Sequence, residues 1–271
     1  MAEDPDLGGA FAKIANANRH LQELEVQIAA SGYADAIGFA QQFNPDTSII
    51  EVTLQGVPEL PVVWSLMAAD CVQNLRCALN YVAWELSRWN LRDQGQAREP
   101  NSRTQFPINT RAREFDAYRL PDVHPDHVAH IQRIQPNGAE HLSQLSEDEL
   151  RLLPVDVLAK RHVLGILVDL TNEDKHRILP RVLVAPAVSQ VGNYTPINCE
   201  ILDTNHFIQV HLENGATWTE FKVRPTGPEP KVDVDDKITP AIQFGAYRVG
   251  LLHQVVEAVN HMVGEFANYI V

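Results

Sequence analysis

Hydrophobic side chains recur at helical spacing in four long segments of the chain. Residues 11–30, 61–90, 155–177 and 246–270 place apolar positions three or four residues apart, which is the period of an amphipathic helix. Pro125 predicts the start of a further short helix, because proline is favoured in the first helical turn. The pattern therefore predicts a mainly helical framework.

Short β-type runs lie between these helical segments. Residues 36–44 and 48–55 flank the turn-like "PDT" and predict a β-hairpin. Residues 92–113 are polar and contain two prolines, which predicts a loop. Four later runs, separated by Gly, Asn and Pro, predict an antiparallel meander; they are "RVLVAPA", "NCEILD", "HFIQVHLE" and "TWTEFKVRP".

Helices at both ends and strands between them indicate an α+β protein. We expect one domain over residues 1–271, in which a helical bundle carries a small antiparallel β-sheet. Residues 180–244 would form a β-rich insert in this bundle.

The helix predicted over residues 61–90 has two different sides. One side is apolar and predicts a core stripe made of Trp64, Ala68, Cys71, Leu75, Leu79, Val82, Leu86 and Trp89. The other carries polar residues, namely Asp70, Gln73, Asn74, Arg76, Asn80 and Tyr81. Lys and Glu do not dominate this polar side, and Cys77 and Trp84 interrupt it. The mixture favours a half-buried polar network over a solvated surface.

A second polar segment, "NEDKHR" at residues 172–177, ends the helix predicted over residues 155–177. Its cations suit the negative end of a helix dipole, which is one interpretation. In the other, four side chains face the Asp70–Asn80 helix and complete a site; these are Asn172, Asp174, Lys175 and His176. A buried Arg76 needs a counter-charge, and we expect Asp174, ahead of the alternative Glu173, to supply it.

Composition narrows the classes of partner. The formal charge of −13 disfavours duplex DNA, which needs a basic protein face. No apolar run is long enough for a membrane span, and the acidic start does not resemble a secretory signal, so we expect a cytoplasmic protein. The three cysteines, Cys71, Cys77 and Cys199, form no CxxC pair and are expected to be buried free thiols.

Metals and cofactors are not expected. His124, His127 and His130 lie three residues apart, but Pro125 predicts a helix start that leaves His124 outside the helix. His162, Asp169 and His176 recur every seven residues, too far apart along a helix to share one ion. The sequence contains no P-loop, GxGxxG or GxSxG motif.

Two stretches carry a resemblance to a known group of proteins. "AADCVQNLRCALNYVAWEL" at 68–86, followed by "NEDKHR", resembles an uncharacterised bacterial family with the pattern GDxxHNLRSALDHLxxxL and a later DKHR-type helix end. "QFPIN" at 105–109 and "QP" at 135–136 also fit this pattern. That family in turn is similar to the helical HEPN domains, many of which are metal-independent ribonucleases and form dimers.

The resemblance implies two alternative functions. In a HEPN-type ribonuclease, Arg76 would hold the scissile phosphate and His176 would act as general acid or base. However, Tyr81 stands where the HEPN pattern has its histidine, and Asn80 stands at an aspartate position. The acidic composition and this missing histidine favour a protein that binds a small-molecule ligand or a partner chain over an active enzyme that cleaves RNA. Val63, Leu66 and Trp84 on the polar side of the helix over residues 61–90 favour a partner surface, so we expect a homodimer.

Overall fold

The computed structural model describes residues 4–33, 35–109, 115, 117–136, 163–171, 182–187, 193–206, 213–235, 239–244 and 247–268. The chain divides into two compact units. The helical unit comprises Met1–Glu23, Leu66–Pro180 and Gly250–Val271, and the β-rich unit comprises Leu24–Ser65 and Arg181–Val249. A compact unit is not by itself an independently folding domain, so the single domain over residues 1–271 stays a prediction.

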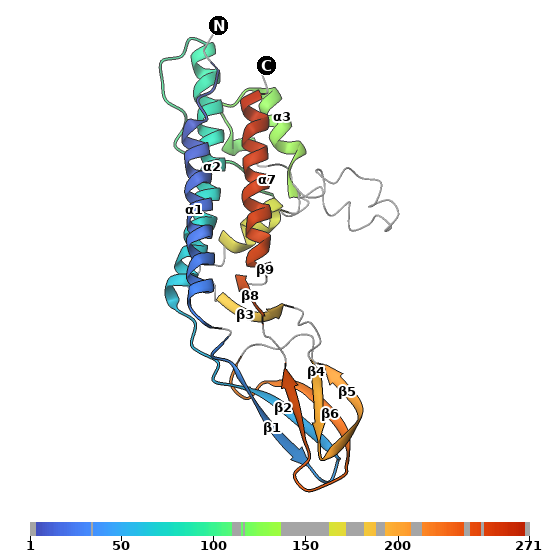
Figure 1. Ribbon diagram of the computed structural model, residues 1–271. Coiled ribbons are helices and arrows are strands. Elements are labelled where there is room, and N and C mark those ends of the chain that lie inside the picture. Colours follow the sequence, from blue (N-terminus) through green and yellow to red (C-terminus); the bar gives the residue numbers. More distant parts are fainter. Residues whose placement is uncertain are drawn as a thin grey trace. The chain divides into compact units, whose positions relative to one another are not determined.

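The described helices follow the predicted periodicity closely. They are α1 (Gly8–Ala30), α2 (Val62–Asp93), α3 (Pro125–Arg133), residues 163–171, α7 (Val249–Asn268) and the short 3-10 helix η1 (Ala117–Arg119). Figure 1 shows α1 beside α2, and α3 beside α7. The predicted helices over residues 11–30, 61–90 and 246–270 and the short helix at Pro125 are confirmed. Of the helix predicted over residues 155–177, the part that the structure describes is helical.

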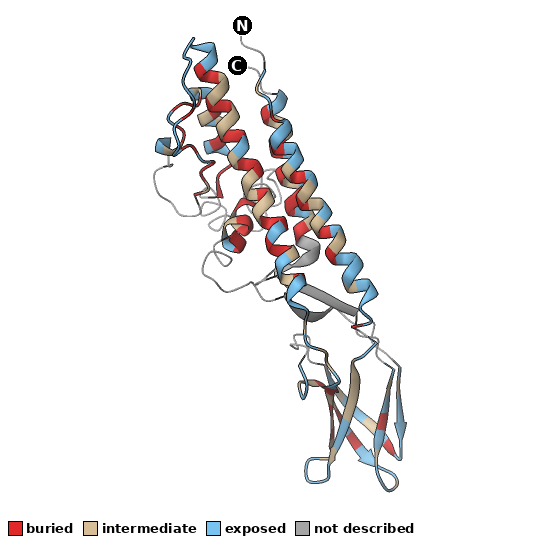
Figure 2. Ribbon diagram, turned by 90° about the vertical axis from the view of Figure 1, so that its left-hand side faces the viewer, coloured by how far each residue is buried: buried red, intermediate tan, exposed pale blue. Residues whose placement is uncertain are grey.

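Each long helix of the helical unit buries one stripe, coloured red in Figure 2. The stripe of α2 is the predicted one, from Trp64 to Leu86, except that Trp89 is only half-buried. Helix α1 contributes small and branched residues at helical spacing, which are Ala10, Ile14, Ala17 and Leu21. Helix α7 contributes Leu252, Val255, Val259, Met262, Val263 and Phe266. Such stripes bury apolar surface that water disfavours, and this stabilises the unit.

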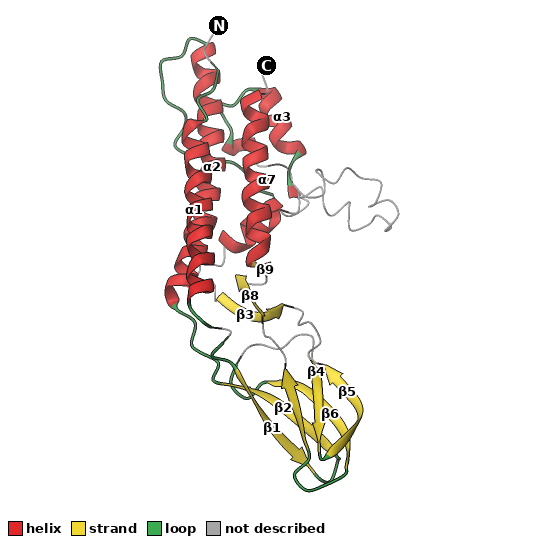
Figure 3. Cartoon of the chain, viewed as in Figure 1, coloured by secondary structure: helices red, strands yellow, loops and turns green. Residues whose placement is uncertain are grey.

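Antiparallel strands make up the β-rich unit (Figure 3). They are β1 (Gly38–Asn44), β2 (Ile49–Gln55), β3 (Val182–Ala187), β4 (Asn193–Ile197), β5 (Cys199–His206), β6 (Thr217–Pro225), β7 (Lys231–Asp235), β8 (Thr239–Phe244) and β9 (Tyr247–Arg248). One sheet has the order β1-β2-β6-β5, a second β3-β8-β9, and a third pairs β4 with β7. The predicted hairpin is β1-β2 and is confirmed.

The later strands pair in a nested arrangement, so the predicted meander is wrong. Strand β5 pairs with β6, β4 pairs with β7 outside them, and β3 pairs with β8 outside those. Strand β6 also pairs with β2 of the early hairpin, so one sheet combines strands that lie far apart in the sequence. Of the run "HFIQVHLE", residues 207–212 lie outside the described residues.

The β-rich unit has its own apolar core. Its centre consists of Ile50, Val52, Leu54, Cys199, Trp218, Phe221, Val223 and Val232. The side-chain amide of Gln41 in β1 donates to the carbonyl oxygen of Val232 in β7 at 2.5 Å and accepts from its N–H at 3.1 Å. Val232 lies opposite Pro196 of β4, which has no backbone N–H to donate. Gln41 therefore links β1 to β7 through its side chain.

These elements confirm the predicted α+β class with an antiparallel sheet. The HEPN-like arrangement of the bundle stays a prediction. None of the described helices is both long enough and apolar enough to cross a membrane.

Candidate functional site

The polar side of α2 makes two separate sets of contacts. Near its start, Asp70 is exposed, and its backbone carbonyl accepts a hydrogen bond from the Asn74 amide at 2.8 Å. The oxygen of the same Asn74 amide accepts from Asn16 of α1 at 3.1 Å. Asn74 therefore connects two helices, and the Asp70 carboxylate stays at the surface.

Further along α2, Arg76 and Asn80 hold one residue of the loop that follows the helix. The Arg76 guanidinium donates through Nη2 to the carbonyl oxygen of Phe106 at 2.8 Å. The N–H of Phe106 donates to Oδ1 of Asn80 at 3.1 Å. Residues four apart lie on one face of a helix, so both side chains reach the same segment. We call this pair of contacts the Phe106 clamp.

Packing reinforces the Phe106 clamp. The Phe106 side chain is fully buried and meets Phe266 of α7 edge-to-face, with ring centroids 6.3 Å apart. Nearby, the N–H of Asn109 donates to the side-chain oxygen of the buried Gln135 at 2.9 Å. The "QFPIN" segment is thus fixed by polar contacts to its backbone and by an aromatic contact to its side chain.

Arg76 is a half-buried cation. Among the described residues, its Nη1 atom is buried and has no hydrogen-bond partner. The pKa of Arg76 is lowered to about 10, first because burial disfavours the charged form and then because Arg119 brings a like charge nearby. A pKa of about 10 leaves Arg76 protonated at neutral pH. The clamp therefore carries a full positive charge.

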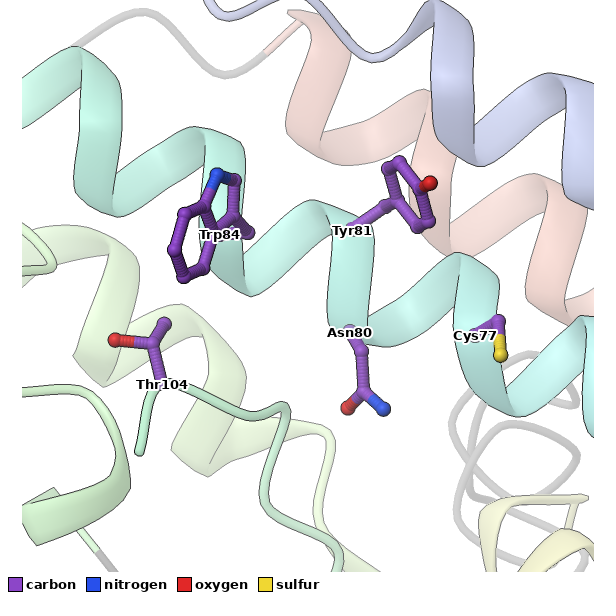
Figure 4. Close-up of a pocket in the computed structure, with 5 residues that line it drawn as sticks. All are labelled: Cys77, Asn80, Tyr81, Trp84 and Thr104. Atoms are coloured by element: carbon purple, nitrogen blue, oxygen red, sulfur yellow. The ribbon is translucent and has the colours of Figure 1, made fainter. Parts of the chain in front are cut away.

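A pocket of about 330 Å³ lies beside the Phe106 clamp. It is lined by Cys77, Asn80, Tyr81 and Trp84 of α2 and by Thr104 of the clamped loop (Figure 4). Thr104 is buried, and its hydroxyl oxygen has no hydrogen-bond partner within the part of the chain that the structure describes. Apolar walls with a few polar groups and a volume of a few hundred Å³ are typical of small-molecule sites.

Close helix packing holds the Tyr81 ring at the pocket. A Cβ atom placed on Gly9 of α1 would lie only 2.8 Å from Cδ1 of Tyr81, so the ring rests directly against the glycine backbone. Tyr81 remains 44% exposed on its other side. Tyr81 therefore forms an aromatic wall of the pocket.

The structure brings some of the predicted site residues together and separates others. Arg76, Asn80 and Tyr81 surround the clamp and the pocket, whereas Asp70 is exposed and Asn74 bonds to α1. The remaining predicted members, Asn172, Asp174, Lys175 and His176, lie outside the described residues. The ion pair between Arg76 and Asp174 and the pairing of Arg76 with His176 therefore stay predictions.

Sequence reasoning missed three lining residues. Cys77 was expected to be a buried thiol, but it is only half-buried, unlike Cys71 and Cys199. Cys77 and Trp84 did interrupt the polar side of α2, and this interruption was the signal for a pocket. Thr104 gave no sequence signal, because its position depends on the Phe106 clamp.

The histidines near α3 make contacts that stabilise the fold. His124 caps the helix that starts at Pro125, and its Nδ1 accepts from the N–H of Asp126 at 3.3 Å. His127 is buried and meets Trp89 edge-to-face, with centroids 5.5 Å apart. In the residues for which side chains are described, no group of three or more His, Cys, Asp or Glu residues could hold a metal ion.

Comparison with known proteins yields no match to any family model, curated protein or solved structure. The resemblance to the HEPN-like family therefore stays a prediction, and function has to be argued from the site itself.

Proposed function

We propose that this chain is a HEPN-like protein that binds a small molecule in the pocket beside the Phe106 clamp. The observation that carries the proposal is the pocket's position on the mixed polar and aromatic side of α2, lined by Asn80, Tyr81 and Trp84. A solvated helix face does not need two aromatic residues and a half-buried cation beside it.

The site has a preformed wall, which supports binding. Arg76 and Asn80 fix the backbone of Phe106, and this positions Thr104 two residues earlier at the pocket. A pocket that is already formed avoids the entropy cost of ordering a loop when the ligand binds.

Asn80 provides the most specific test. Its Oδ1 accepts from Phe106, while its Nδ2 has no hydrogen-bond partner among the described residues. Asn80→Asp keeps an acceptor for the Phe106 N–H and removes the free donor. Compounds found in a thermal-shift screen of the full chain should bind Asn80→Asp and Trp84→Ala at least tenfold more weakly than the unmodified protein.

Gln94→Glu is the matched control, since Gln94 directly follows the last residue of α2, does not line the pocket and acquires the same charge. Its affinity for each compound should equal that of the unmodified protein. Compounds whose affinity is unchanged in Asn80→Asp and Trp84→Ala bind elsewhere and would contradict the proposal.

A second candidate is a metal-independent ribonuclease that uses Arg76 and His176. The Nη1 atom of Arg76, which has no hydrogen-bond partner in the described part of the chain, supports it, because a guanidinium suits a phosphate. Against it, Nη2 already holds the Phe106 carbonyl and Tyr81 replaces the local histidine. We expect no cleavage of a labelled single-stranded RNA. Cleavage that both Arg76→Lys and His176→Ala abolish would establish the ribonuclease instead.

A further inference from the structure

We infer that the pocket selects a planar organic anion, with a carboxylate or similar acceptor at Nδ2 of Asn80 and a flat apolar body against Trp84 and Tyr81. The inference rests on the proposed function and specifies the chemical class of the ligand.

Hydrogen-bonding roles define the acceptor. The Phe106 N–H can only donate, so the atom of the Asn80 amide that faces it is the oxygen. The Asn80 NH₂ group is then directed away from Phe106 as a donor. Trp84, which also lines the pocket, carries an indole N–H that can only donate. A ligand that forms hydrogen bonds with the Asn80 NH₂ group and the Trp84 N–H therefore has to present acceptors.

The charge next to the pocket defines the anion. Arg76 lies one helical turn before Asn80, and no Asp or Glu among the described residues forms an ion pair with it. Arg119 lies near enough to act on Arg76 as a second cation. The chain as a whole carries −13, so this local positive charge is opposite in sign to its surroundings. A half-buried cation favours an anion nearby.

The walls define the flat body. Tyr81 and Trp84 supply the aromatic rings of the lining, and Gly9 prevents the Tyr81 ring from moving toward α1. The volume of about 330 Å³ is at the small end of the range for ligand pockets, so a one- or two-ring molecule fits better than a long chain. Figure 4 shows Trp84 and Tyr81 on successive turns of α2, above Thr104 and Asn80.

The test compares two probes of nearly equal shape, 2-naphthoate and the neutral 2-naphthamide, by calorimetry on the full chain at low salt. We expect the acid to bind at least tenfold more tightly. Added salt should weaken the binding of the acid and leave that of the amide unchanged, because salt screens the attraction between charges. Arg76→Met should remove most of the preference, and Arg119→Gln should reduce it. Arg88→Met, on the same helix but outside the pocket, should preserve it.

The outcomes separate the two proposals. Equal affinity for both probes, or tighter binding of the amide, overturns the inference that the pocket selects an anion. The proposal of a ligand pocket then still stands. Binding of neither probe overturns the pocket as a site for flat molecules and the proposed function with it. Asp174→Asn should leave the preference unchanged, and this result would also contradict the expected ion pair between Arg76 and Asp174. A preference that rises in this variant means that Asp174 neutralises Arg76, and it overturns Arg76 as the source of the attraction. If Arg76→Met fails to fold, Arg119→Gln and the salt dependence decide the question.

Discussion

At the scale of single residues, Arg76 and Asn80 answer why amides and a guanidinium stand in the middle of a core helix. They satisfy the N–H and the carbonyl of a buried loop residue, Phe106, whose backbone polar groups would otherwise lack partners. Their polar character is therefore structural. Nη1 of Arg76 and Nδ2 of Asn80 remain without a partner among the described residues.

Arg76→Ala should destabilise the protein by about 1–3 kcal/mol, because the carbonyl of the buried Phe106 loses its donor. Arg88→Ala should have a much smaller effect, since Arg88 is 38% exposed and its ion-pair distances to Glu85 and Glu99 are 3.7 and 3.9 Å. Urea midpoints measure the difference. Equal midpoints for the two variants would mean that Arg76 does not hold the loop.

Asp122 should make stability depend on acid pH. Hydrogen bonds from Arg98, and then from the Asn101 N–H, hold the pKa of this buried carboxyl below its usual range. A lowered folded pKa stabilises the protein above the unfolded value of about 3.9, and this contribution is lost as the pH falls through the folded value. Between pH 5 and 2, Asp122→Asn should lose less stability than the unmodified protein.

Asp93→Asn, at the exposed end of α2, is the control for this pH profile. Its urea midpoint should follow that of the unmodified protein across the same range. If Asp122→Asn also follows it, the Arg98 pair makes no contribution to the acid sensitivity.

At the scale of elements, close approaches decide how neighbours pack. Gly9 and Gly264 both lie in helices, but only a Cβ at Gly9 meets another side chain, that of Tyr81 at 2.8 Å, whereas nothing lies within 4 Å at Gly264. The local sequence does not distinguish these two glycines. They differ because a neighbouring helix approaches Gly9 closely.

Gly264→Ala should stabilise the protein by about 0.5–1 kcal/mol, because alanine loses less backbone entropy than glycine in a helix. Gly9→Ala should gain less, because the new methyl group displaces the Tyr81 ring, and it should also weaken ligand binding at the pocket. Thermal midpoints and titrations of both variants measure these effects. An equal gain in stability with unchanged binding would show that Tyr81 moves aside freely.

Gln41 connects β1 to β7 in the β-rich unit. Gln41→Ala should cost about 1 kcal/mol or more, since both polar groups of the Val232 backbone lose their partner. Gln42→Ala, one residue along and exposed on the same strand, is the control and should change the urea midpoint little. Similar midpoints for both variants would contradict a structural role for Gln41.

At the scale of the whole molecule, assembly remains a prediction. Val63 and Leu66 of α2 are 42% and 46% exposed, and exposed apolar side chains on one helix favour a partner surface. We expect a homodimer in solution, and Leu66→Glu should dissociate it. Light scattering measures the mass of both proteins. A monomer at high micromolar concentration of the unmodified chain would refute the dimer.

The sequence by itself determined the helices and the first hairpin. Their signals are local: the stripe from Trp64 to Leu86 and the β-branched run at residues 49–55 recur within a few positions, so short-range periodicity is enough to find them. It also singled out Arg76, Asn80 and Tyr81, because amides and a guanidinium on a helix otherwise lined by aromatic and aliphatic residues are unusual.

Tertiary structure alone decided what these residues do. The Phe106 clamp joins residues 30 positions apart, and the Gln41 contact joins residues 191 positions apart, so neither leaves a periodic trace in the sequence. The nested pairing of β3 to β8 replaced the meander, since every antiparallel partner has the same alternating pattern and the pattern does not specify which strands pair. The pocket likewise depends on the clamped loop, which places Thr104 against α2. The sequence of α2 alone indicates only the residues on its own side of the pocket.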